Sequence, residues 1–363
     1  MSMFVSDRSD QILNLNGKVL TADMFRQETL VLPSDGIYRD ICLFLKDWFN
    51  DSPLITVHTS GSTGKPKAIQ VAKDRMQASA EFTCKYLGLT AGSRALLCLP
   101  VSYIAGKMML VRALVSGFRI DAIEVNGHPF SVADQLYDFV ALIPLQVVNS
   151  LNDELEKERL QSVKNVIVGG AAIDPELEKQ LCDFPNAVYS TYGMTETLSH
   201  IAMRRVSGLE RSLFYEPLDE VNLSMSDKGT LEIYAPRVCA ERLQTNDCVV
   251  FNEQGAFRII GRVDNVINSG GVKLQIEEIE SKIASAFRSH FAITSVPDMK
   301  LGERVVLLYE GFQDEGQLEA MLKTELSVYE YPKHILRVSC IPLTESGKIK
   351  RKECSALAIN LLT

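Results

Sequence analysis

The chain has 363 residues, of which 46% are hydrophobic and 23% are charged. This length predicts about two domains, and the apolar content is sufficient for real cores, which excludes a disordered tail or a disulfide-stapled miniprotein. A formal net charge of -8 repels a phosphodiester backbone, so nucleic acid is not expected to be the main partner.

Eight cysteines are spread along the chain without a C-x-x-C pair, which is typical of reduced, mostly buried thiols and argues against a zinc cluster. The opening residues, MSMFVSDRSD, lack the uninterrupted apolar core of a signal peptide. The most apolar stretch, residues 95–117, is interrupted by Pro100, Lys107 and Arg112, so it falls short of an apolar membrane span of about 18 residues. The sequence therefore predicts a cytoplasmic protein with no membrane anchor.

Short β-rich runs alternate with amphipathic helical stretches along the first part of the chain, which favours an α/β fold. In chain order, the predicted elements are strand 54–57, helix 75–87, strand 95–99, strand 163–168, helix 175–182 and strand 187–191. Asp174 followed by Pro175 is typical of the N-cap and first position of a helix.

From Gly229 the pattern changes to short strands with tight turns, in KGTLEIYA, CVVFNEQGAFRIIG and GVKLQ. A domain boundary is predicted at residues 261–265. After it come a strand–turn–strand and then, in order, helix 276–287, strand 304–309, helix 316–326 and a polar loop at 344–351. The predicted fold is a large layered α/β domain with a β-rich segment over residues 1–263, and a small mobile α+β domain over residues 264–363.

A run of hydroxyls, glycines and lysines, TSGSTGKPK, occupies residues 59–67. Hydroxyls and free backbone N–H groups surround an anion and lysine supplies charge, so the run suits a polyphosphate. It is not a Walker loop, because Gly61 and Gly64 are too close together, Pro66 follows the lysine, and KAIQVA predicts a returning strand. By composition alone, a hairpin turn is the competing interpretation.

The whole run resembles the phosphate-binding signature of the adenylate-forming superfamily, which includes acyl-CoA synthetases, luciferases and peptide-synthetase adenylation domains. Further motifs similar to those of the superfamily follow in order: GGAA at 169–172, YGMTET at 192–197, TND at 245–247, GRVD at 261–264, GGVKL at 270–274 and SGKIKR at 346–351. Asn246 replaces the glycine of the superfamily's T-G-D, which puts the local turn in question. Only 58 residues precede the phosphate run, so the chain is expected to lack much of the N-terminal part of larger relatives.

The resemblance implies an enzyme that joins a small-molecule carboxylic acid to AMP, using ATP and Mg²⁺, and then passes the acyl group to coenzyme A. The residues that it assigns to ATP and AMP are Thr59, Ser60, Gly61, Ser62, Thr63, Gly64, Lys65, Gly169, Gly170, Ala171, Tyr192, Asp247 and Arg262. Tyr192 would stack on adenine and Asp247 would bind the ribose. Thr195 would bind the α-phosphate, and Glu196 would help to hold Mg²⁺.

The superfamily uses one active site for two half-reactions, between which the small domain rotates at a hinge, here Asp264. The resemblance assigns Lys348 to adenylation, and Gly270, Gly271 and Lys273 to the loop that meets the thiol of coenzyme A. Taken singly, Lys348 is typical of a solvated basic tail, Glu196 of a helix entry and Asp247 of a turn. The ordered set of motifs favours the site.

Within the superfamily, LPVSYIAGKMMLVRAL and YGMTETLSHIA most resemble the ligases that couple o-succinylbenzoate to coenzyme A in menaquinone biosynthesis. A second carboxylate on the acid needs a buried cation, and Lys107 and Arg112 interrupt an apolar helix. They lie roughly 140° apart on that helix, so only one of them is expected to face the acid. Ser199 and His200 are further candidates for the acyl pocket.

Other interpretations stay open at this point. Lys107 and Arg112 could also pack their aliphatic stems on an apolar surface while their charged groups reach solvent. His200 could be a core histidine whose hydrogen bonds are satisfied. The protein as a whole could transfer its acyl group to a carrier protein or another acceptor, or could be a non-catalytic nucleotide-binding relative.

Overall fold

The structure is a computed structural model that describes residues 4–27, 35–59, 67–287, 289–312, 314–343 and 349–362. The chain forms two compact units. The first unit comprises residues 1–173, 177–223 and 233–243, and the second comprises residues 174–176, 224–232 and 244–363. The boundary predicted from the sequence, between residues 263 and 264, separates the part of the chain that is expected to rotate from the rest. That boundary stays a prediction.

A nine-stranded sheet with the order β11-β10-β9-β8-β7-β5-β6-β1-β2 organises the first unit. Its strands are β1 (Ile12–Leu15), β2 (Lys18–Thr21), β5 (Arg94–Leu97), β6 (Arg119–Ala122), β7 (Phe139–Leu142), β8 (Asn165–Val168), β9 (Ala187–Gly193), β10 (His200–Arg205) and β11 (Glu216–Pro217). The strands from β9 to β1 along this order pair in parallel. Every residue of β7 and β8 is buried, as in strands that are covered on both faces.

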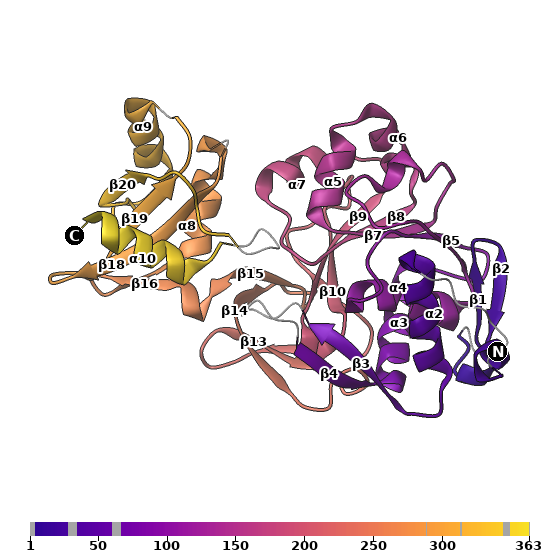
Figure 1. Cartoon of the computed structure of the whole chain (residues 1–363). Helices are drawn as coiled ribbons and strands as arrows, with labels where there is room; N and C mark the ends of the chain where they lie inside the picture. The colour runs from indigo at the N-terminus through magenta and orange to yellow at the C-terminus, as the bar shows by residue number, and fades with distance from the viewer. Residues whose placement is uncertain are drawn as a thin grey trace. The chain divides into compact units, whose positions relative to one another are not determined.

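Helices cover both faces of this sheet (Figure 1). One face carries α5 (Pro144–Leu151), α6 (Glu154–Ser162) and α7 (Pro175–Leu181), and the other carries α2 (Gly36–Phe49), α3 (Lys73–Leu87) and α4 (Ile104–Ser116). The short helix α1 (Ala22–Arg26) precedes α2. The α/β prediction for this part of the chain is confirmed.

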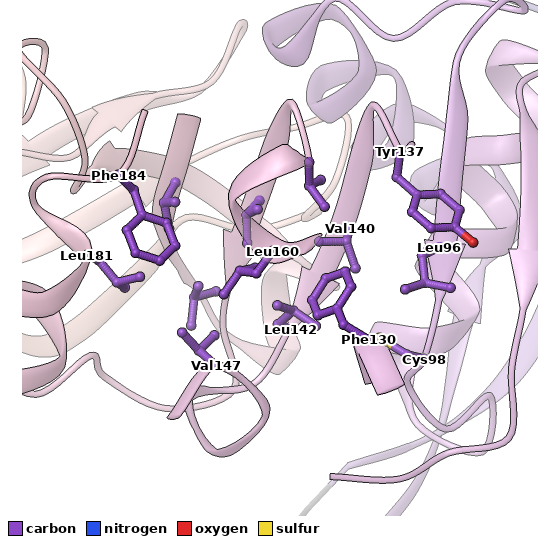
Figure 2. Close-up of a cluster of buried hydrophobic side chains, with 14 of the residues drawn as sticks. Leu96, Cys98, Phe130, Tyr137, Val140, Leu142, Val147, Leu160, Leu181 and Phe184 are labelled. Carbon is purple, nitrogen blue, oxygen red and sulfur yellow. The ribbon is translucent and has the colours of Figure 1, made fainter. Parts of the chain in front are cut away.

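The core under α5, α6 and α7 fixes the strands that carry the candidate site (Figure 2). Val140 and Leu142 of β7 are two positions apart, so both point toward this face, where they share a cluster with Val147 of α5 and Leu160 of α6. Each such side chain contributes about 1.5–3 kcal/mol when it is fully buried. The ends of β7 and β8 are therefore held rigidly where the chain leaves the sheet.

A separate two-stranded hairpin flanks the phosphate run. β3 (Leu54–Thr59) pairs antiparallel with β4 (Lys67–Ala72), with Thr59 opposite Lys67. The returning strand predicted for KAIQVA is confirmed. Residues 60–66 between the two strands lie outside the described residues.

The β-rich segment forms a four-stranded sheet with the order β12-β13-β14-β15. Its strands are β12 (Asn222–Met225), β13 (Thr230–Tyr234), β14 (Leu243–Phe251) and β15 (Phe257–Arg262). The next sheet of the second unit is built from β16 (Val266–Ser269), β17 (Val272–Gln275), β18 (Phe291–Asp298), β19 (Gly302–Tyr309) and β20 (His334–Arg337). The described residues of this unit also form the helices α8 (Ile276–Ile283), α9 (Glu315–Glu325) and α10 (Arg351–Leu362).

The helix predicted over 276–287 is wrong at its end, because α8 stops at Ile283 and Ala284–Ala286 form a 3-10 turn, η5. Phe287 stacks on Phe291 with a ring-centroid distance of 4.4 Å, and it is extended. Aromatic packing thus draws the chain out of the helix and toward β18. The other 3-10 turns are η1 (Arg8–Asp10), η2 (Pro129–Ser131), η3 (Thr195–Thr197) and η4 (Val263–Asn265). Of the helices within the described ranges, none is both long enough and apolar enough to cross a membrane.

Candidate active site

The predicted GGAA segment follows β8, and the YGMTET segment begins with the last two residues of the neighbouring strand β9. Val168 of β8 pairs with Leu142 of β7 and with Ser190 of β9, so these parallel strands end at the same edge. The hydroxyl of Thr191 donates to the Val168 carbonyl at 3.2 Å, and the Gly169 amide donates to the Leu142 carbonyl at 3.0 Å. The carboxyl edge of a parallel sheet is where ligands bind in open α/β folds.

Gly169 and Gly170 are required by the backbone at this edge. A Cβ atom on Gly169 would lie 2.6 Å from the hydroxyl of Thr191, which is closer than real contacts allow. Gly170 has a φ of +83°, in the left-handed region that favours glycine. Ala171 follows them at the same edge, half-buried. The first predicted AMP-binding segment therefore passes directly beside β9.

Tyr192 and Gly193 end β9 at this edge. The ring of Tyr192 is 8% exposed and lies 6.0 Å, between centroids, from the ring of Tyr215. A Cβ atom on Gly193 would lie 2.4 Å from the Ser199 carbonyl oxygen and 2.6 Å from the His200 Cα atom. Because those neighbours are backbone atoms, only glycine lets the chain fold back from β9 into β10. The stacking of Tyr192 on adenine stays a prediction.

The turn between β9 and β10 presents Thr195 and Glu196 at the surface. The buried Thr197 hydroxyl accepts from the Met194 amide at 3.0 Å and donates to the Ser199 carbonyl at 2.8 Å. Leu198 adopts a φ of 65°, which is rare for a side chain of its type. The turn is thus fixed by one buried hydroxyl, and the two predicted phosphate and Mg²⁺ residues lie on its exposed side.

Arg112 of α4 is a buried cation beside this turn. Only 2% of it is exposed, and its guanidinium donates from Nη2 to the Ser199 hydroxyl at 2.9 Å and from Nη1 to the Met109 sulfur at 3.7 Å. Its buried Nε has no hydrogen-bond acceptor within the described part of the chain. Burial lowers the pKa of Arg112 to about 10, which still leaves it charged at neutral pH. A head group that reaches solvent is therefore the wrong interpretation for Arg112.

His200 adjoins the same group. Its Nε2 lies 3.0 Å from the Thr83 hydroxyl of α3, and its Nδ1 lies 3.4 Å from the Ser199 hydroxyl. Burial, and then the charge of Arg112, hold the pKa of His200 well below its usual value. The sequence gives no sign of Thr83, because it looks like any small residue on the buried face of α3 and its partner is 117 positions away.

Lys107 points to a different neighbour. Its ammonium lies 5.4 Å from the centroid of the Phe44 ring of α2, and burial lowers its pKa. Lys107 therefore packs against α2, whereas Arg112 contacts the turn before β10.

Asp247 and Arg262 come together in the second unit through the pairing of β14 and β15. Arg262 donates to Asp247 at 3.0 Å and to Asp264 at 3.4 Å. Asp247 lies within β14 and is 9% exposed, so its interpretation as a turn residue is wrong. The strand also continues through Asn246, whose side chain donates to Asp264 at 3.0 Å. The substitution in T-G-D therefore leaves no turn at this position and adds a contact to the predicted hinge residue.

Gly270 and Gly271 form a two-residue turn between β16 and β17, with φ values of +60° and +83°. A type I′ hairpin requires two successive residues with positive φ, so the turn geometry alone is sufficient to explain the two glycines. Lys273 follows in β17, opposite Asn268, and is exposed. The contact of this loop with coenzyme A stays a prediction.

Several predicted residues lie outside this description. Residues 60–65 of the phosphate run and Lys348 are not among the described residues, and the side chain of Thr59 is not described. A polar cavity of about 270 Å³ is present in the first unit, lined by residues 6–9, 26 and 49–51. None of these lining residues belongs to the predicted site.

Comparisons with known proteins show the family to which this chain belongs. Residues 23–223 match the family of AMP-binding enzymes, and the chain belongs to that family. It is 27% identical to the 2-succinylbenzoate–CoA ligase of Listeria innocua serovar 6a, over 92% of this chain and 74% of that protein. The predicted superfamily is confirmed.

Solved structures give the same result for the fold. The chain is 35% identical to an acyl-CoA synthetase (AMP-forming)/AMP-acid ligase II-like protein from Dyadobacter fermentans, with a TM-score of 0.64 over 92% of this chain and 97% of that one. The o-succinylbenzoate CoA synthetase from Bacillus subtilis, in complex with the acyl-adenylate intermediate OSB-AMP, is 21% identical. The match covers 82% of this chain and 68% of the Bacillus subtilis chain, with a TM-score of 0.71, so the two chains share a fold.

Proposed function

We propose that this protein is an ATP-dependent acid–thiol ligase that acts on o-succinylbenzoate and coenzyme A. Membership of the AMP-binding enzymes supports the formation of an acyl-adenylate, and the relatives named 2-succinylbenzoate–CoA ligase support this acid and this acceptor. The eight cysteines are free thiols, six of them buried, which is typical of a reducing compartment and supports a cytoplasmic location.

The observation that carries the choice of acid is the buried guanidinium of Arg112. o-Succinylbenzoate has two carboxylates, and only one of them becomes the adenylate, so the other stays anionic throughout. A desolvated guanidinium forms strong hydrogen bonds to a carboxylate, and the Nε of Arg112 still needs an acceptor. Ser199 is half-buried and contacts Arg112, so the second carboxylate approaches this cation beside Ser199.

In the first half-reaction, a carboxylate oxygen of the acid attacks the α-phosphorus of ATP, and the bond to the bridging oxygen of pyrophosphate breaks. Two anions approach each other in this step, so cations must be positioned around them. We assign Lys65 and the phosphate run to the leaving pyrophosphate, Thr195 to the α-phosphate, and Lys348 to the reacting carboxylate. Asp247 and Tyr192 are assigned to ribose and adenine.

Mg²⁺ suits the carboxylate of Glu196. This cation binds through one or two carboxylates while it keeps waters and substrate phosphates as its other ligands, and Glu196 offers one exposed carboxylate beside Thr195. When bound, Mg²⁺ would neutralise charge on the phosphates of ATP.

The test is pyrophosphate release from ATP across a panel of aromatic and aliphatic acids, with and without coenzyme A. We expect o-succinylbenzoate to give the fastest release, and the Lys348→Ala variant to slow the release by about 10²–10³-fold, the effect of losing one oriented transition-state donor. The product formed with coenzyme A is identified by chromatography.

Each result decides between the candidates. If no acid triggers release, the protein is not the proposed enzyme but a non-catalytic nucleotide-binding relative. If acyl-AMP accumulates and no acyl-CoA forms in the presence of coenzyme A, the acceptor is a carrier protein or another nucleophile. An unchanged rate in Lys348→Ala would contradict the role of that lysine.

A further inference from the structure

Four side chains from three separate segments form one hydrogen-bonded series in the first unit. Thr83 belongs to α3, Arg112 to α4, and Ser199 and His200 lie where β10 begins. The contacts run from Arg112 to Ser199 at 2.9 Å, from Ser199 to His200 at 3.4 Å and from His200 to Thr83 at 3.0 Å. The series ends where the Thr83 hydroxyl meets the Ser79 carbonyl at 3.2 Å.

A hydrogen bond from Thr83 to the Ser79 carbonyl gives this series one consistent set of directions. When the Thr83 hydroxyl donates its proton to the Ser79 carbonyl, its oxygen accepts from the N–H of His200 Nε2. Nδ1 is then the acceptor, and it receives the proton of the Ser199 hydroxyl. The Ser199 oxygen keeps a lone pair for Arg112. With these directions, His200 is the neutral Nε2–H tautomer.

Burial makes each hydrogen bond of this series difficult to replace. Thr83 is 0% exposed, Arg112 2% and His200 7%, so water offers little substitute for a lost partner. A second proton on His200 would turn Nδ1 into a donor, reverse the contact with Ser199, and place a second positive charge beside Arg112. The tautomer and the orientation of the guanidinium are thus coupled.

We infer that Thr83 and His200 are positioning residues, which hold the Ser199 hydroxyl in the orientation that fixes the guanidinium of Arg112 for the second carboxylate of the acid. This inference rests on the proposed function. It assigns neither residue to the reacting atoms. Its consequence is selective, because the binding of a dicarboxylate depends on the orientation of Arg112, whereas the adenylation of an acid without the second carboxylate does not.

The competing explanation is that the series only stabilises the core. A purely structural defect would lower the fraction of folded enzyme, and so would reduce the turnover of all acids equally. A positioning defect raises the KM for the dicarboxylate and leaves the monocarboxylate unaffected. The comparison of two acids on one enzyme therefore separates the two explanations.

The experiment compares Thr83→Val, which removes the hydroxyl at nearly constant shape, with Thr83→Ser, which keeps it. The two acids are o-succinylbenzoate and the same keto acid without the ring carboxylate, and pyrophosphate release is the readout. We expect Thr83→Val to raise the KM for o-succinylbenzoate about tenfold, the effect of one misplaced charged hydrogen bond. The KM for the monocarboxylate changes less than about twofold, and Thr83→Ser restores the KM for o-succinylbenzoate.

His200 provides a second pair of variants. The side-chain oxygen of asparagine reaches the position of Nδ1 and preserves the acceptor for Ser199, whereas the amide nitrogen of glutamine reaches the position of Nε2 and preserves only the donor to Thr83. We expect His200→Gln to raise the KM for o-succinylbenzoate more than His200→Asn does. Nitrogen-15 NMR of the histidines in the wild type at pH 7.5 should show His200 as the Nε2–H tautomer.

Three results would each overturn the inference: equal losses with both acids in Thr83→Val, no rescue by Thr83→Ser, or His200 as the Nδ1–H tautomer or imidazolium. Release of pyrophosphate by the wild type, together with any of these, overturns the inference alone. If the wild type releases no pyrophosphate with any acid, the proposed function fails, and the inference fails with it.

Discussion

His200 shows how much chemistry at the scale of a single residue depends on its neighbours. The sequence alone allows either a pocket residue or a satisfied core histidine, and the buried imidazole between Thr83 and Ser199 has features of both. Its pKa is depressed by burial and by Arg112, so the folded protein holds it neutral.

This depressed pKa predicts a loss of stability in mild acid. Below pH about 6.5 the unfolded chain protonates this histidine and the folded chain does not, so the free energy of unfolding falls as pH falls, by about 1.4 kcal/mol per pH unit. Urea unfolding at pH 7.5 and 5.5 should therefore show a smaller pH dependence for His200→Asn than for the wild type. Exposed His290, replaced in the same way, is the control. The same pH dependence in the wild type and His200→Asn would contradict this assignment.

The site residues differ in how far the sequence can predict them. Gly169, Tyr192 and Glu196 were predictable because each lies in a short motif that the chain keeps contiguous. The pairing of Asp247 with Arg262 follows from two motifs on adjacent strands of one hairpin. Thr83 and the contact of Asn246 with Asp264 were not predictable, because each depends on packing between segments that no local pattern connects.

At the scale of elements, the central strands and the helices with clear periodicity were predictable, and the remaining elements were not. β20 has only half-buried and exposed residues, so its alternation is weak. α10 was not predicted because its first residues are charged and overlap the polar loop expected over 344–351, and because its fully buried residues are only the small Cys354 and Ala358. The early end of α8 depends on aromatic packing onto Phe291, which helix propensity does not include.

The anchor of α10 gives a prediction about these elements. Arg351 binds Glu280 of α8 through two hydrogen bonds of 2.5 and 2.7 Å, and Glu280 also accepts from the Ile293 amide at 2.8 Å. Burial raises the pKa of Glu280 even though Arg351 opposes the shift. Removal of one partner from such a pair leaves an uncompensated buried charge, so Arg351→Met should lower the free energy of unfolding by about 3–5 kcal/mol in urea.

The double variant Glu280→Leu/Arg351→Met is the control for this pair, because it removes both charges and should recover most of the loss. A loss of less than about 1 kcal/mol in Arg351→Met would show that α10 does not depend on this ion pair. Lys323→Met, which breaks an exposed pair with Glu319, serves as the comparison for an ordinary surface contact.

At the scale of the whole molecule, the proposed function depends on two lysines that are distant in sequence. Lys348 and Lys273 are assigned to successive half-reactions, and both are in the region predicted to rotate about Asp264. Short motifs identify the two residues but not the orientation of a domain, because orientation depends on small interfaces that change during the cycle. Kinetics of the separate half-reactions is therefore the direct test of this assignment.

Lys273→Ala should separate those half-reactions. Its side chain is exposed on β17, so its loss should not disturb folding, and adenylation should continue because Lys348 is intact. Thioester formation from preformed acyl-AMP and coenzyme A should fall by about tenfold or more, as expected when a cation beside the thiol is lost. Single-turnover assays measure pyrophosphate release and acyl-CoA formation separately, and Lys300→Ala, an exposed lysine of the same unit, is the matched control. Equal losses in both steps would mean that Lys273 does not act in the second half-reaction alone, and the proposed alternation of the two lysines would have to be abandoned.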